Sequence, residues 1–237
     1  MKIALLGYGK MGHEVEKIAL ENGHSIGLTI DNENDWLEKG KILNECDVAI
    51  EFSMPAIAIE NIHKCFEAGI PIVVGTTGWY DHFQQIAELC ISGNKSLFYA
   101  SNFSIGANIF FDINRRLATL LEAYPKYSPS IVEIHHIQKL DAPSGTAITL
   151  GNDIMAVNSR YTKLTETNTG AGEIPVHSIR EGSIPGTHTI IWSSDIDQIS
   201  IIHEAKNRRG LALGALMAAA WVQNRSGVFT MKDMLNL

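Results

Sequence analysis

Two adjacent histidines and a lysine lie in a short segment, residues 135–147, that also contains a Pro-Ser-Gly-Thr turn. His135, His136 and Lys139 can each deliver a proton or bind negative charge, because imidazole titrates near neutral pH and ammonium carries three donors. Apolar positions after the turn have helical spacing, so Gly145 and Thr146 are predicted to open a helix whose free N–H groups favour an anion. The segment therefore predicts a site that binds an anionic substrate and moves protons.

The apolar segment before the histidines is predicted to be a buried strand. Side chains alternate between faces along a strand, so His135 and His136 should point in opposite directions, and only one can share a face with Glu133. The alternative is purely structural: Asp141 or Ser144 caps the helix, and the histidines are hydrogen-bonded strand residues. A lone histidine would favour that alternative, whereas the full cluster favours a functional site.

A second motif begins near residue 1, where an apolar segment of strand length is followed by a glycine-rich turn and then a helical pattern. Gly7 permits a tight turn, Gly9 lets the backbone approach a pyrophosphate, and Gly12 allows close helix–strand packing. The alternative is an ordinary strand-to-helix turn. The spacing favours a dinucleotide-binding loop, which consists of Gly7, Tyr8, Gly9, Lys10, Met11 and Gly12.

Asp31 ends the second predicted strand, at the distance from the glycines where an acidic residue commonly binds the adenosine ribose. Its alternative role is that of a turn residue at the strand end. The next residue is Asn32 rather than arginine, which removes the most obvious partner for a 2′-phosphate and favours NADH. Lys10, Lys39 or Lys41 could still serve NADPH, so either cofactor remains open.

Strands alternate with helices through the first hundred residues, which predicts a parallel sheet with ligands at the carboxyl ends of its strands. Two polar loops follow predicted strands there. One contains Gly75, Thr76 and Thr77, and the other spans residues 101–106. We expect both loops to contact the cofactor, with a plain turn as the alternative.

The pattern changes at about residue 107, where a long predicted helix is followed by strands with few helices between them. This order fits a mixed or antiparallel sheet in an α+β domain. Residues 161–173, rich in Thr, Asn and Gly, could form a mobile loop across a cleft, although a plain surface connection is preferred. A small-residue helix at 211–223 is expected to pack back on the first domain. Arg208 or Arg209 would then lie at a hinge, where either could bind a substrate carboxylate or only surface acids.

Composition excludes several classes of protein. The 237 residues are 45% hydrophobic and 19% charged, which is typical of a folded globular chain of one or two domains. The formal net charge is −7 and no basic run exceeds two arginines, so nucleic acid is a poor candidate for a partner. Three cysteines without CxxC spacing, no signal peptide and no membrane-length apolar segment predict a cytoplasmic protein.

Nearly the whole chain resembles the dihydrodipicolinate reductases, also called 4-hydroxy-tetrahydrodipicolinate reductases, of the bacterial diaminopimelate–lysine pathway. The most specific part of the resemblance is the segment 133–147, EIHHIQKLDAPSGTA. Further matching segments are residues 7–12, 75–78, 102–106, 178–182, 186–188 and 208–221. The resemblance implies a homotetramer that reduces its dicarboxylate substrate to tetrahydrodipicolinate with NADH or NADPH, with NADH slightly favoured.

The resemblance also assigns residues to roles. His135 would be the proton donor or acceptor, Lys139 the second proton donor, and His136 would bind substrate beside Gly145 and Thr146. The dinucleotide would be lined by the glycine loop together with Asp31, Gly75, Thr76, Thr77, Ala100, Ser101, Asn102 and Phe103. A Rossmann-type dinucleotide-binding domain would comprise residues 1–106 and 207–237, and a smaller α+β domain, residues 107–206, would bind substrate and form the tetramer.

The chemistry of these residue types agrees with that reaction. Hydride addition to a conjugated C=C–C=N system creates negative charge that an acid must quench, and two carboxylates require cations and N–H donors. Whether His135 or Lys139 delivers the proton is open, and no metal is expected. The alternatives are a diaminopimelate-, homoserine- or semialdehyde-type dehydrogenase, the last of which needs a cysteine nucleophile. A non-catalytic NAD(H) sensor would have no need of the histidines and the lysine.

Overall fold

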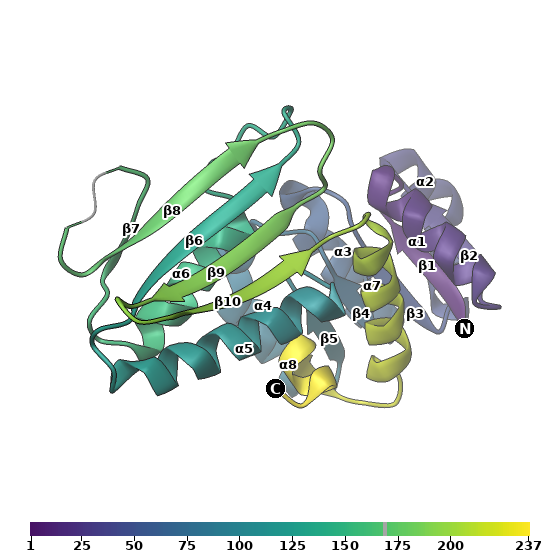
Figure 1. Cartoon of the computed structure of the whole chain (residues 1–237). Coiled ribbons are helices and arrows are strands. Elements are labelled where there is room, and N and C mark those ends of the chain that lie inside the picture. Colours follow the sequence, from purple (N-terminus) through teal and green to yellow (C-terminus); the bar gives the residue numbers. More distant parts are fainter. Residues whose placement is uncertain (168–169) are drawn as a thin grey trace. The chain divides into compact units, whose positions relative to one another are not determined.

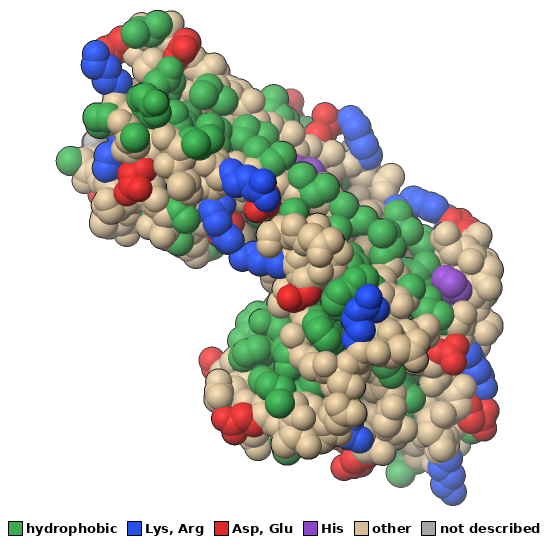
Figure 2. All heavy atoms as spheres, turned by 90° about the horizontal axis from the view of Figure 1, so that it is seen from below, with side chains coloured by type: hydrophobic (Ala, Val, Ile, Leu, Met, Phe, Trp, Pro, Cys, Tyr) green, Lys and Arg blue, Asp and Glu red, His purple; other side chains and the backbone are tan. Residues whose placement is uncertain are grey.

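The structure is a computed structural model that describes residues 1–167 and 170–237. Internal contacts divide the chain into two compact units. Unit 1 contains Met1–Ile105 and Arg209–Leu237, and unit 2 contains Gly106–Arg208. Each unit has its own sheet (Figure 1). Acidic and basic side chains are scattered among hydrophobic ones on the face shown in Figure 2.

Unit 1 is built on a six-stranded sheet in the order β11-β5-β4-β3-β1-β2, and every neighbouring pair is parallel. This confirms the predicted Rossmann-type architecture. The central strands are apolar along their length because helices cover both faces of the sheet. The strands are β1 (Lys2–Leu6), β2 (Ser25–Ile30), β3 (Val48–Glu51), β4 (Ile72–Val74), β5 (Ser96–Tyr99) and β11 (Gly227–Phe229).

Two hydrophobic clusters, one on each face of this sheet, hold the helices of unit 1 in place. One face is covered by α1 (Lys10–Glu21), α7 (Arg209–Val222) and α8 (Met231–Leu235). The other is covered by α2 (Glu33–Lys39), α3 (Pro55–Ala68) and α4 (Phe83–Ser92), with short 3-10 turns at Gly40–Glu45 and Tyr80–His82.

The helix α7 is the predicted small-residue helix, and it packs against α1 and the sheet of unit 1. Gly214 lets α7 pack closely against the loop that follows β5, because a Cβ atom at this position would lie 1.8 Å from the carbonyl oxygen of Phe103. Four alanines on the same helix are fully buried: Ala212, Ala215, Ala218 and Ala219. The chain therefore returns to unit 1 through a helix whose small residues fit its neighbours.

Unit 2 has a five-stranded mixed sheet in the order β10-β9-β6-β8-β7. The central strand β6 runs parallel to β8 and antiparallel to β9. Helices α5 (Ile105–Glu122) and α6 (Gly145–Val157) pack with the sheet around one hydrophobic core. The strands are β6 (Ser128–His135), β7 (Lys163–Thr165), β8 (Glu173–Arg180), β9 (Thr187–Ser193) and β10 (Gln198–Glu204).

The sequence-based prediction for residues 161–173 was partly wrong. Lys163–Thr165 forms β7, which pairs in parallel with β8. A single apolar residue in this three-residue strand leaves no alternating pattern to detect, and the strand forms because β8 supplies its hydrogen-bonding partner. Residues 168–169 of the segment lie outside the described residues. None of the helices in the described part of the chain is long and apolar enough to cross a membrane.

Candidate active site

The strand β6 places Glu133 and His135 on the same buried face, because alternate residues of a strand point to the same side. The Glu133 side chain is fully buried and His135 is 6% exposed. His136 follows the last residue of the strand, and its N–H donates to the carbonyl of Ile184 at 2.8 Å. The predicted sharing of one face by Glu133 and a single histidine is confirmed, and that histidine is His135.

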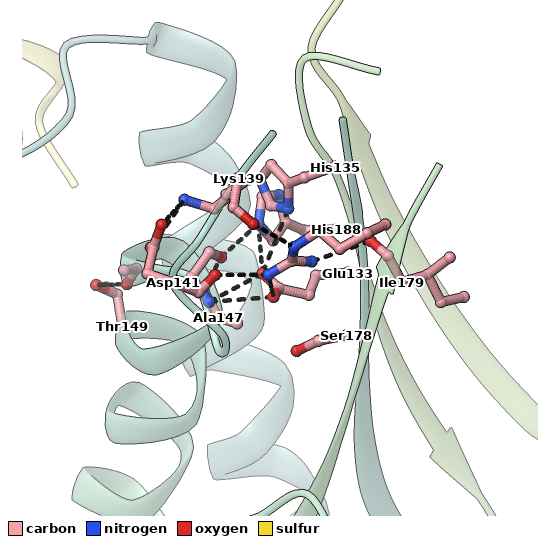
Figure 3. A network of polar contacts seen from close by, with 12 residues as sticks. Glu133, His135, Lys139, Asp141, Ala147, Thr149, Ser178, Ile179 and His188 are labelled. Carbon is pink, nitrogen blue, oxygen red and sulfur yellow. Dashed lines mark hydrogen bonds and ion pairs between the residues drawn. The ribbon is translucent and has the colours of Figure 1, made fainter. Parts of the chain in front are cut away.

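Four groups surround the carboxylate of Glu133 (Figure 3). The backbone N–H of Ser144 donates to both of its oxygens at 3.1 Å, and Nη2 of Arg180 lies 3.1 Å from Oε1. Nδ1 of His135 lies 3.5 Å from Oε2, and Nε2 of His188 lies 3.7 Å from the same oxygen. A buried charge of this kind is tolerated only when it is paired and hydrogen-bonded, which is the case here.

The surroundings of Glu133 keep it ionised. Burial alone would raise the pKa of this carboxyl, but hydrogen bonds and contacts from His188 and Ser144 lower the pKa by more, so that it lies well below its usual range. Glu133 is therefore a permanent anion in the folded protein. It can orient its partners, and it is unsuited to donate a proton.

The same surroundings keep the imidazole of His135 neutral. Burial, followed by the nearby His188, lowers the pKa of His135 to about 4, although the Glu133 anion opposes that shift. The rings of His135 and His188 meet edge to face, with centroids 5.0 Å apart. At neutral pH, His135 can thus accept a proton or donate through a neutral tautomer.

The start of α6 is both capped and open. The Ser144 side chain accepts a hydrogen bond from the N–H of Ala147 at 3.2 Å, and its hydroxyl lies 3.1 Å from Nε2 of His188. The part of the structural alternative in which Ser144 caps the helix is therefore correct. Gly145 is exposed, and a Cβ atom there would meet nothing within 4 Å, so space remains for an anion at the helix start.

Lys139 lies on an exposed loop between β6 and α6. Its ammonium nitrogen is 2.8 Å from both carboxylate oxygens of Asp141, and this contact lowers the pKa of Asp141. The contact with Asp141 fixes the position of the Lys139 ammonium, which lies four residues after His135 along the chain. An incoming carboxylate can compete for this cation, because the pair is partly exposed and contributes little by itself.

Glu133, His135 and His188 also have the composition of a metal site, and one ligand atom from each lies within 4.8 Å of the others. The carboxylate already has partners, however. Arg180 and the Ser144 N–H bind Glu133, and a metal ion would have to lie beside the arginine charge. The geometry therefore fits a hydrogen-bonded ion-pair network better than it fits a metal centre.

Two members of this network, Arg180 and His188, had no role in the interpretation of the sequence. They lie in the segments 178–182 and 186–188, which carried the family resemblance without an assigned chemistry. The pairing of β8 and β9 with β6 sets Arg180 opposite His135 and His188 opposite Glu133. Both strands carry several other polar residues, so no local pattern distinguishes these two.

The glycine loop of unit 1 has the geometry that its sequence predicts. Gly7 has φ +91°, and a Cβ atom there would lie 2.4 Å from the carbonyl oxygen of Phe52. A Cβ at Gly12 would lie 2.4 Å from the carbonyl oxygen of Gly7. Gly9 is exposed, has open space above it and provides no side-chain cap for α1. The first N–H groups of α1 are thus accessible to a pyrophosphate, so the loop fits a dinucleotide.

Asp31 lies beside this loop, immediately after β2. Its carboxylate accepts a hydrogen bond from the backbone N–H of Tyr8 at 2.8 Å, and its own N–H donates to Asp35 at 2.9 Å. Lys39 is paired with Asp35 at 2.6 Å. Asp31 therefore does more than end a strand, and one of the three lysines considered for a 2′-phosphate is engaged by a neighbouring acid.

Two further loops lie at the same edge of the unit 1 sheet, after β4 and β5. Thr76 is buried, and its carbonyl accepts from Nε1 of Trp79 at 2.9 Å, whereas Thr77 is exposed. In the second loop Phe103 is buried. The other predicted cofactor contacts in these loops, all partly or fully exposed, are Gly75, Ala100, Ser101 and Asn102. All the predicted dinucleotide residues therefore lie in unit 1, and the predicted catalytic and substrate residues lie in unit 2.

The arginine and cysteine candidates for substrate binding or catalysis include residues that the structure assigns to surface ion pairing or to the core. Arg209 pairs with Glu21 at 2.6 Å, so one of the two arginines considered for a substrate carboxylate binds a surface acid. Cys46, Cys65 and Cys90 are buried, and burial raises the pKa of each thiol. A thiolate nucleophile of the kind that a semialdehyde dehydrogenase requires is thus disfavoured at all three.

The fold and the site define a class: a Rossmann-type oxidoreductase whose second, mixed-sheet unit carries the histidines and the lysine. A family model described as the amino terminus of dihydrodipicolinate reductase matches residues 1–103, and one for its carboxyl terminus matches residues 106–235. The chain belongs to the dihydrodipicolinate reductase family, whose members are NAD(P)H-dependent oxidoreductases. The predicted family and enzyme class are confirmed, against the other dehydrogenases and the non-catalytic sensor.

Relatives match over nearly their whole length. The 4-hydroxy-tetrahydrodipicolinate reductase of Christiangramia forsetii is 46% identical over 236 residues, which cover 100% of this chain and 98% of that protein. That of Neisseria meningitidis is 33% identical over 94% of this chain and 84% of its own. A dipicolinate-bound dihydrodipicolinate reductase from Paenisporosarcina sp. TG-14 shares the fold, with a TM-score of 0.79 and 22% identity over 99% of both chains.

The low pKa of His135 predicts an acid-dependent loss of stability. Unfolding returns the imidazole to a pKa near 6.5, so the unfolded state takes up a proton first and stability falls as the pH drops from about 6.5 to about 4. The contribution lost is about 3 kcal/mol, and it is fully present above pH 6.5. Urea unfolding across this range should show a shallower pH dependence for His135→Gln than for the wild type. The control His177→Gln, at an exposed position on β8, should keep the wild-type slope; an unchanged slope for His135→Gln would refute the assignment.

Proposed function

We propose that this protein is a 4-hydroxy-tetrahydrodipicolinate reductase, which forms tetrahydrodipicolinate in the diaminopimelate–lysine pathway. The relatives in Christiangramia forsetii and Neisseria meningitidis carry this name. The observation that carries the proposal is the buried Glu133 carboxylate, which accepts a hydrogen bond from the N–H of Ser144 at the start of α6 and lies 3.5 Å from Nδ1 of His135. A proton-transfer group and an anion-binding helix start thereby lie next to one side chain.

Substrate carboxylates would bind where unit 2 presents N–H donors and positive charge. The open start of α6 at Gly145 and Thr146 would bind one carboxylate, with His136 as a further donor. Lys139 would exchange part of its contact with Asp141 for the substrate. The negative charge of a bound dicarboxylate would also raise the pKa of His135, because it stabilises the imidazolium form.

The balanced reaction consumes one hydride and one proton. The hydroxyl group of the substrate and a hydrogen of the adjacent ring carbon leave together as water, a hydride is added to the conjugated ring that forms, and a proton neutralises the resulting charge. NADH or NADPH, bound at the glycine loop of unit 1, would supply the hydride. Lys139, which carries an ammonium proton, and His135, which can relay one, are the groups that we assign to the proton.

A coupled assay tests the proposal directly. The substrate is generated from pyruvate and aspartate semialdehyde by its synthase, and the oxidation of NADH and NADPH is followed separately by absorbance. Oxidation that depends on the synthase supports the proposal. If neither cofactor is oxidised while the protein still binds NADH, the proposed substrate is wrong.

Substitution of the proposed proton-transfer groups should separate turnover from cofactor binding. We expect His135→Gln and Lys139→Gln each to lower kcat at least about 100-fold, the scale of general acid–base catalysis. The Kd for NADH, measured by fluorescence, should change less than twofold, because both residues lie in unit 2 and the glycine loop lies in unit 1. A large loss of NADH affinity would show that the site is misplaced. Lys126→Gln, at an exposed position before β6, is the control and should retain wild-type kcat.

We further propose that NADH is the preferred cofactor. The Asp31 carboxylate is exposed beside the glycine loop, where it can accept hydrogen bonds from ribose hydroxyls and would repel a 2′-phosphate. Asp35 next to it neutralises Lys39. The charge around this position therefore disfavours NADPH.

The variant Asp31→Asn keeps an oxygen that can accept from the Tyr8 N–H but removes the negative charge. We expect the ratio of kcat/KM for NADH to that for NADPH to fall about tenfold, equivalent to about 1.4 kcal/mol. Glu33→Gln, at an exposed position in the first turn of α2, serves as the control and should leave the ratio within twofold of wild type. An Asp31→Asn enzyme with the wild-type ratio would contradict the role of Asp31.

A homotetramer formed through unit 2 is proposed on the family resemblance. Exposed hydrophobic side chains on the sheet of unit 2 support it: Ile179 on β8 is 42% exposed and Ile202 on β10 is 64% exposed. Such residues are typical of sheet faces that associate. The cytoplasmic location stays a prediction from the sequence.

A further inference from the structure

The loop that carries Lys139 is not held by burial of its own apolar side chains. Ile137 is 69% exposed and Leu140 is 97% exposed. Exposed loops without apolar contacts are mobile unless polar contacts fix them. The position of the Lys139 ammonium must therefore depend on hydrogen bonds made by the backbone of the loop.

Two of those hydrogen bonds join backbone groups: the N–H of Ile137 donates to the carbonyl oxygen of Gly182 at 3.3 Å, and that of Lys139 to the carbonyl oxygen of His136 at 3.1 Å. Two others come from the side chain of Arg180, the last residue of β8. Its Nη2 donates to the carbonyl oxygen of Asp141 at 2.6 Å, and its Nε donates to that of Lys139 at 3.3 Å. The same Nη2 lies 3.1 Å from Oε1 of the buried Glu133. One guanidinium group thus joins the loop backbone to the anion at the centre of the site.

The far end of the loop is fixed to the same carboxylate, because the Ser144 N–H donates to both oxygens of Glu133 at 3.1 Å. The segment from Lys139 to Ser144 is therefore bound to Glu133 at both ends, directly at one and through Arg180 at the other. Arginine suits this position because its planar fork offers several donors in fixed directions, whereas lysine offers a single nitrogen.

We propose that Arg180 is a positioning residue of the reaction: it ties the backbone of Lys139 and Asp141 to Glu133 and so holds the Lys139 ammonium where it delivers the proton. This inference rests on the proposed function, in which Lys139 is a proton donor. Arg180 itself need not touch the substrate. Its loss should therefore impair turnover through the loop and leave cofactor binding intact.

The chain offers a matched control in Arg160, a second half-buried arginine of unit 2. Arg160 donates to the carbonyl oxygens of Leu121, Pro125 and Tyr127 at 2.8, 3.1 and 3.3 Å. These residues precede β6, whereas Arg180 lies opposite the last residue of that strand. Both arginines clamp backbone carbonyls, but only one of these two clamps includes the Lys139 loop.

We would compare Arg180→Ala with Arg160→Ala by turnover, NADH affinity and amide hydrogen exchange. For Arg180→Ala we expect kcat to fall at least tenfold, the Kd for NADH to stay within twofold, and exchange in residues 137–141 to accelerate. Added guanidinium ion should restore part of the lost kcat by filling the vacated position. Arg160→Ala should keep wild-type kcat per folded molecule and normal exchange in 137–141, and guanidinium should not increase its activity.

The outcomes separate this proposal from the proposed function. If Arg180→Ala keeps wild-type kcat and wild-type exchange in residues 137–141, the positioning role is refuted. If the wild type fails to oxidise either cofactor, the proposed function falls, and the exchange measurement alone decides whether Arg180 holds the loop. Should Arg180→Ala fail to fold, Arg180→Lys replaces it; a kcat close to wild type in that variant would also refute the role, because one ammonium cannot reproduce the fork.

Discussion

The candidate site depends on one buried carboxylate, which has lost its hydration and must be paired by protein groups. Glu133 lies fully buried on β6, so its charge persists only if the surrounding chain provides partners. Those partners are the Ser144 N–H, Arg180 and His188, while His135 lies 3.5 Å away on β6 itself. The partners come from the N-cap of α6 and from the strands on either side of β6, so pairing of this one anion fixes the start of a helix and three strands relative to one another.

The two groups that would move protons are held in place in different ways. His135 shares the buried face with Glu133 and is neutral at pH 7, whereas Lys139 keeps its ammonium on an exposed loop. Burial fixes the first group, and hydrogen bonds to loop carbonyls fix the second. The mixed order of the sheet matters here, because β8 and β9 lie on opposite sides of β6 and each contributes one basic residue to the Glu133 network.

Local patterns in the sequence predicted what depends on local interactions. The glycine spacing predicted the loop after β1, and strand alternation predicted that only one of the two adjacent histidines shares a face with Glu133. The roles of Arg180 and His188 could not be predicted, because they depend on pairing between strands that are distant in sequence, and short strands such as β7 and β11 carry too few residues for a periodic signal. The catalytic and cofactor assignments stay predictions, supported by the position of each residue in its unit.

The central claim, that the Glu133 charge organises the site, is tested most directly by Glu133→Gln, which preserves shape and removes the charge. We expect the free energy of unfolding to fall by about 3 kcal/mol, because Arg180 is left without its anion, and kcat to fall at least tenfold. Glu122→Gln, at an exposed position at the end of α5, provides the comparison and should change the free energy of unfolding by less than about 1 kcal/mol. A Glu133→Gln protein with wild-type stability and turnover would contradict the account.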